Sequence, residues 1–101
     1  MELKLPTDAE TNHLFEDVAA DLCSNFGYSA ARAAEVVRDY YAKFRDEEYC
    51  DQINIPTQDD DFFFHEGVRG MAMRVHYYIG LNENPNPHAY IEWRSSYRVG
   101  K

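Results

Sequence analysis

Apolar residues recur at helical spacing through the first half of the chain. In the first segment they fall three or four positions apart, polar side chains line the other side, and Gly27 follows as a stop signal. This pattern predicts an amphipathic helix from about residue 8 to residue 26, with Thr7 as N-cap and Glu10 in the capping-box position. Its apolar face contains Leu14, Phe15, Val18, Ala19, Leu22, Cys23 and Phe26.

A second amphipathic helix is predicted from Ser29, as its N-cap, to about Tyr49. The link between the two helices is very short, so they should form an antiparallel αα-hairpin. Residues 50–56 are expected to be a connector, which Pro56 prevents from continuing as helix.

The stretch 57–81 carries the densest run of large apolar side chains. Thr57 and Asp60 have capping-box spacing, and Asp59, Asp60 and Asp61 fall in the first turn, where negative charge suits the helix dipole. Gly67 and Gly70 each cost about 1 kcal/mol in a helix interior relative to Ala. They either allow another backbone to approach closely or mark a kink or break.

Read as one helix, this stretch is apolar on two sides. One side is a core face made of Phe64, Val68, Met71, Ala72, Val75, Tyr78 and Ile79. The opposite face is not plainly polar, which indicates either a second core layer supplied by residues 87–97 or a surface for a partner. That second face holds Phe62, Glu66, Arg69, Met73 and Tyr77, with His65 and His76 at its edge.

The C-terminal third has two interpretations. Residues 71–79 and 89–99 both alternate between apolar and polar positions, which is compatible with a β-hairpin across the loop 82–88. Asn86 followed by Pro87 instead makes a good N-cap and first helical residue, predicting a helix over 87–97. We favour an all-α, four-helix single domain over residues 1–101, with the N-terminal αα-hairpin packed on a central two-sided helix plus a short C-terminal helix; α+β with the 71–79/89–99 hairpin is the alternative.

The chain is acidic, with a net charge of −8 over 101 residues. Residues 1–50 contain five Lys or Arg against eleven Asp or Glu, so they carry −6 of that charge. Such a surface disfavours nucleic acid and anionic membranes and favours a basic protein partner. The two cysteines, Cys23 and Cys50, fit no metal-ligand spacing and are expected to be free thiols, and no signal-like segment is seen, so a cytoplasmic location is predicted.

His65, Glu66, Arg69 and His76 form the best candidate for a polar site. On one helix the two histidines would lie about 16 Å apart at 1.5 Å per residue, too far to share a metal ion. Position 69 is Arg, so no HExxH motif is present. Glu66 and Arg69 have the spacing of a helix-surface ion pair. We expect no metal, no cofactor and no catalytic constellation.

These patterns favour a non-enzymatic, acidic protein-binding module, of the kind represented by immunity proteins and antitoxins, which inhibits or regulates a basic protein. One alternative is a small enzyme or a ligand- or metal-binding protein using the polar site at His65, Glu66, Arg69 and His76, and another is an architectural homodimer. The expected partner-binding residues are Phe62, Glu66, Arg69, Met73, Tyr77, Asp59, Asp60 and Asp61.

Overall fold

The computed structural model describes residues 3–97, and every regular element in that range is helical. The elements are α1 (Ala9–Phe26), α2 (Ala30–Phe44), α3 (Glu47–Gln52), α4 (Asp60–Val75), the π-helical turn η1 (His76–Gly80) and α5 (Pro87–Ser96). The all-α prediction is confirmed. The alternative β-hairpin is not supported, because residues 71–79 lie in α4 and η1 and residues 87–96 lie in α5.

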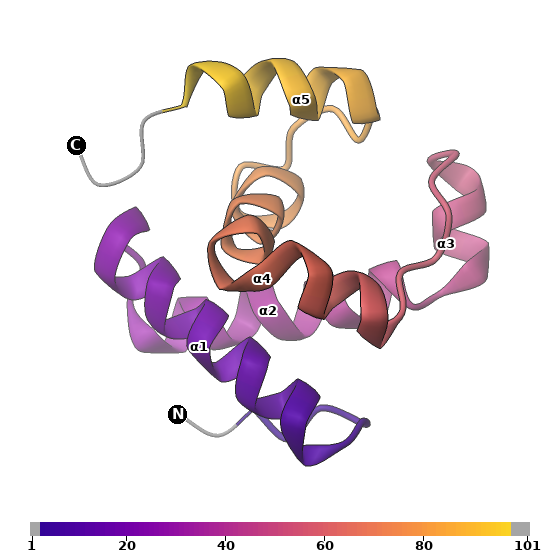
Figure 1. The fold of residues 1–101 in the computed structure, drawn as a ribbon. Coiled ribbons are helices and arrows are strands. Elements are labelled where there is room, and N and C mark those ends of the chain that lie inside the picture. The colour runs from indigo at the N-terminus through magenta and orange to yellow at the C-terminus, as the bar shows by residue number, and fades with distance from the viewer. Residues whose placement is uncertain (1–2, 98–101) are drawn as a thin grey trace.

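Helices α1 and α2 form the predicted hairpin, and α4 packs against both of them (Figure 1). Gly27 ends α1 in the left-handed conformation at φ 78°, and Ser29 begins α2 by accepting a hydrogen bond from the Arg32 amide at 3.1 Å. The N-cap of α1 is Asp8, which accepts from the Thr11 amide at 2.8 Å, so the prediction of Thr7 is wrong by one residue. Thr7 donates its hydroxyl proton to Asp60 instead.

Helix α2 is shorter than predicted. It ends at Phe44, and a separate short helix, α3, begins three residues later at Glu47, with Asp46 as its N-cap. The Asp46 carboxylate accepts from the Glu48 amide at 3.0 Å, so this side chain favours a fresh helix start over continuation to Tyr49. The connector expected over 50–56 is therefore helical as far as Gln52.

Gly67 breaks α4 into two helical pieces. Its backbone angles, φ 80° and ψ 176°, lie in a region that is essentially restricted to glycine. The break changes the helical phase, so Phe63 is fully buried and Phe64 is 47% exposed, the reverse of their places on one continuous helix. The prediction of a single helix over 57–81 with Phe64 in the core is wrong, and the alternative of a kink at Gly67 is confirmed. The helix also begins later than predicted, with Asp59 rather than Thr57 as its N-cap.

Helix α5 lies across η1 on the side away from α2 (Figure 1). Asn86 caps it by accepting from the His88 amide at 2.8 Å, and Pro87 occupies its first turn, as predicted. Its inward side consists of aromatic rings: Tyr90 and Trp93 meet Tyr77 with centroid separations of 5.2 and 5.1 Å. Aromatic contacts therefore attach this helix to the rest of the core.

Candidate functional site

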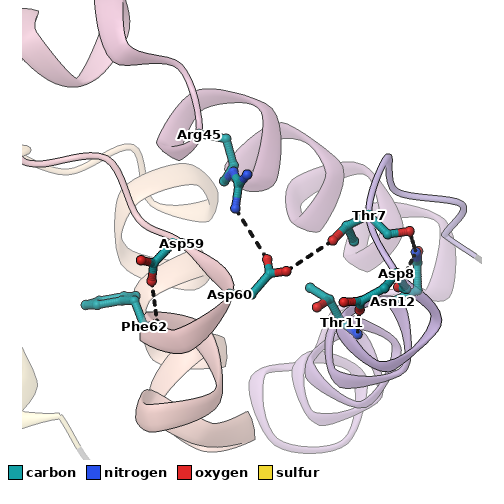
Figure 2. Close-up of polar contacts among 8 residues, drawn as sticks. All are labelled: Thr7, Asp8, Thr11, Asn12, Arg45, Asp59, Asp60 and Phe62. Carbon is teal, nitrogen blue, oxygen red and sulfur yellow. Dashed lines mark hydrogen bonds and ion pairs between the residues drawn. The ribbon is translucent and has the colours of Figure 1, made fainter.

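The three aspartates at the start of α4 have different roles, and Figure 2 shows two of them, Asp59 and Asp60. Asp59 caps the helix by accepting from the Phe62 amide at 2.9 Å. Asp60 lies 3.3 Å from the Arg45 guanidinium and also accepts the Thr7 hydroxyl at 3.4 Å, so it connects α2, α4 and the N-terminal segment. Asp61 is exposed. Asp60 is therefore partly committed to the fold, whereas Asp61 is available to a partner.

These aspartates belong to a longer acidic segment, residues 46–61, which contains seven Asp or Glu and no Lys or Arg. The Gln58 amide donates to the Phe44 carbonyl at 2.9 Å, and this bond places the start of α4 beside the junction of α2 and α3. The fold thus gathers both ends of the segment on one side of the molecule. Its exposed carboxylates are Asp46, Glu47, Glu48, Asp51, Asp59 and Asp61.

The predicted second face of the central helix is closed inside the monomer. Tyr77 is 2% exposed and donates its hydroxyl proton to the Asn84 carbonyl at 2.7 Å. Met73 is also buried, and half-buried Phe62 lies under the Arg74 guanidinium, whose carbon is 4.9 Å from the ring centroid. The expectation that Met73 and Tyr77 are exposed to a partner is therefore wrong, because α5 supplies the second core layer that was the alternative.

Glu66 and Arg69 do not form the ion pair that their spacing suggested. The break at Gly67 lies between them, and Glu66 instead contacts Arg74 at 2.9 Å and Arg94 at 3.8 Å. Burial lowers the pKa of Arg74, but the Glu66 hydrogen bond and nearby charges outweigh that effect and leave it raised. Glu66 therefore neutralises a half-buried cation and helps to join α4 to α5.

Arg69 reaches across to α1, where it contacts both carboxylate oxygens of Asp21 at 2.7 and 3.1 Å. The hydrogen bonds that Arg69 donates to Asp21 raise the pKa of the Arg69 guanidinium. Such a two-point contact holds the second half of α4 on α1. Sequence reasoning missed Asp21 because no local spacing relates residues 21 and 69.

The two histidines of the alternative polar site lie in different surroundings. His65 is exposed, whereas His76 is half-buried and its Nδ1 lies 2.6 Å from the Tyr28 hydroxyl. Burial lowers the pKa of His76. His76, Glu66 and Arg69 each contact a different partner, so the structure does not bring the four polar residues together as one site. Sequence reasoning also missed the contact between Tyr28 and His76. The position of Tyr28 before the N-cap of α2 does not indicate this contact.

Three further observations bear on the classes of function considered. Within residues 3–97, no three His, Cys, Asp or Glu side chains are grouped so as to hold a metal ion. In the same range, no helix combines the length and apolar character that crossing a membrane requires. Cys23 and Cys50 are both free thiols, the second of them buried.

Comparison with known proteins adds no assignment: no family model, no curated protein and no solved structure matches this chain.

Proposed function

We propose that this chain is a non-enzymatic protein-binding module whose acidic segment, residues 46–61, engages a basic protein. One observation carries the proposal: six carboxylates of this segment are exposed, and no cation lies between them in the sequence. Most other charged side chains are engaged within the fold, as in the pairs Lys43–Asp39 and Arg69–Asp21. Clustered charge of one sign attracts an oppositely charged partner and accelerates its association.

Phe64 adds an apolar contact to the proposed binding surface at residues 46–61. It is 47% exposed and lies three residues after Asp61 in the first helical piece of α4, so the two side chains share a face. An aromatic side chain beside exposed carboxylates fits the apolar centre and polar rim that protein interfaces show. Phe64 thereby takes the place of Met73 and Tyr77 in the binding surface. The expected mode of action is inhibition or regulation of the basic partner, as by immunity proteins and antitoxins.

The proposal is tested by capture of partners from the native host followed by affinity measurements on the identified protein. The binding variant replaces four exposed carboxylates of the segment: E47Q, E48Q, D51N and D61N. The matched control replaces four exposed carboxylates elsewhere, E10Q, D17N, E83Q and E92Q, and changes the net charge by the same amount.

We expect the wild type and the control to retain a basic protein with similar affinity. The binding variant should bind it at least about fourfold more weakly, because it removes four charges and each exposed charge pair contributes roughly 0.2–1 kcal/mol. Equal weakening in both variants would show that only overall charge matters. Retention of no basic protein by the wild type would contradict the proposal, and light scattering would then show whether self-association accounts for the surface.

A further inference from the structure

A pocket of about 500 Å³ lies between the N-terminal residues 3–6 and α2, away from the histidines considered above. Pockets that bind small molecules commonly have volumes of roughly 300–1,000 Å³. Most of its lining is apolar and comes from both walls: Leu3, Leu5, Pro6, Tyr41 and Ala42. The pocket therefore has the size and lining of a site for a small apolar body.

The N-terminal wall of this pocket is held in place by specific hydrogen bonds. Asn12 accepts from the Leu5 amide at 2.7 Å and donates to the Leu5 carbonyl at 3.0 Å. Arg38 donates its Nε proton to the Leu3 carbonyl at 3.1 Å. Between them, Lys4 adopts a left-handed backbone conformation at φ 56°, which is uncommon for a lysine and requires support from its surroundings. The wall is thus a positioned segment of the fold.

The charge of the lining is opposite to that of the whole molecule. Among the residues that the structure describes, the pocket lining contains the cations Lys4, Arg38 and Arg45 and the anion Asp46, whereas the chain as a whole carries −8. Arg45 also contacts Asp60 at 3.3 Å, which offsets part of its charge, and its guanidinium lies 5.7 Å from the Tyr41 ring centroid. Cationic side chains beside an apolar lining are complementary to a molecule with an anionic head and an apolar body.

We propose that this pocket binds a small amphipathic carboxylate. Its apolar body lies against Leu3, Leu5 and Tyr41, and its carboxylate lies near Lys4 and Arg45. Charge-assisted hydrogen bonds from Arg and Lys to a carboxylate are stronger than those between neutral groups. This site is independent of the proposed protein-binding function, although Asp46 belongs to both the pocket and the acidic segment.

Decanoate, used below its micelle-forming concentration, is the probe, and its binding is followed by calorimetry and by amide chemical shifts. Decan-1-ol and decyltrimethylammonium have the same alkyl chain with a neutral and a cationic head. We expect decanoate to bind at least about tenfold more tightly than decan-1-ol and to shift the amides of residues 3–6 and of α2. Equal binding of all three compounds, or no binding of decanoate, would overturn the proposal.

Two variants locate the site. Ala42→Phe fills the pocket from its α2 wall and should abolish decanoate binding, whereas Ala20→Phe, at an exposed alanine of α1, should leave it unchanged. If A42F proves unfolded, the double variant K4Q/R45Q keeps the pocket volume and removes two charges. It should weaken decanoate at least about tenfold while leaving decan-1-ol unaffected, and unchanged decanoate affinity would contradict the assignment.

Discussion

At the scale of single residues, the hydrogen bond between Tyr28 and His76 leaves no room for a side chain at Gly80. A Cβ atom at position 80 would lie 1.8 Å from the Tyr28 hydroxyl and 3.3 Å from His76 Nδ1. Absence of a side chain at Gly80 thus allows the 2.6 Å contact between Tyr28 and His76 that joins the α1–α2 link to η1. Three other aromatic rings, Phe26, Trp93 and Tyr97, surround the His76 ring at centroid separations of 5.0–5.9 Å.

Gly80→Ala should destabilise the fold by about 1–3 kcal/mol, the usual cost of forcing extra volume into a packed site. Urea unfolding measures this change. The same substitution in a Tyr28→Phe background should cost less, since the hydroxyl that the methyl group strikes is gone. An additive double-mutant cycle would show that residues 28 and 80 do not interact.

The half-buried His76 predicts a dependence of stability on pH. Because burial lowers the pKa of His76 in the folded state from its usual 6.5, the unfolded chain binds the proton first as pH falls. The stabilisation from neutral His76 is complete above about pH 6.5 and is lost as pH falls through the lower, folded-state pKa. Unfolding free energies of the wild type and His76→Gln, measured from pH 7.5 to pH 5, should therefore converge toward low pH.

His65→Gln, a substitution at an exposed histidine of α4, is the control for this series. A constant difference between the wild type and H76Q over the whole pH range would contradict the account of His76.

At the scale of elements, the break at Gly67 predicts that replacing this glycine by alanine destabilises the protein, whereas a continuous helix predicts that it stabilises it. Gly67→Ala meets no steric neighbour, but its φ of 80° and ψ of 176° are strained for any L-residue. We expect G67A to destabilise the protein by about 1–3 kcal/mol. In an unbroken helix the same substitution would stabilise by about 1 kcal/mol. Thermal or urea unfolding distinguishes the two signs, and a stabilised G67A would rule out the break.

The attachment of α5 is tested at its buried tyrosine. Tyr90 is 2% exposed, and its ring lies 5.2 Å from the Tyr77 ring and 5.4 Å from the Tyr78 ring. Tyr90→Ala should cost about 3–5 kcal/mol, as truncation of a large aromatic core side chain does. Ile91→Ala, at a neighbour that is 61% exposed, should change stability by less than about 0.5 kcal/mol. Similar losses for both would indicate that α5 is not packed as described.

The elements that sequence reasoning placed well are those with unambiguous ends. Gly27, Ser29 and the Asn86–Pro87 pair each carry a backbone preference that acts locally, so the structure agrees with the prediction there. The wheel for 57–81 failed at Phe64 because it assumed one helical phase, and a single glycine reset that phase. Periodicity also does not show which element covers a given helix face. It therefore did not decide whether the second face of the central stretch packs against α5 or binds a partner.

At the scale of the whole molecule, charge is unevenly distributed. The segment 46–61 has exposed carboxylates without interspersed cations, while the described residues that line the pocket at residues 3–6 include Lys4, Arg38 and Arg45. The acidity was visible in the sequence, and Asp61 was among the residues expected to contact a partner. The long-range ion pairs Arg69–Asp21 and Arg45–Asp60 could not be predicted from the sequence, because they depend on how distant helices pack. The candidate surface could therefore be predicted only in part.

The most direct test of the acidic segment as a binding surface is the association rate constant of the captured basic partner, measured at 50 and 200 mM salt. Steered association slows as salt screens exposed charges, because the Debye length falls to about 10 Å at 0.1 M. We predict that the wild-type rate constant falls steeply with salt. The variant with E47Q, E48Q, D51N and D61N should lose most of that dependence, while the matched E10Q, D17N, E83Q and E92Q variant keeps it. A wild-type rate constant that does not change with salt would contradict the account.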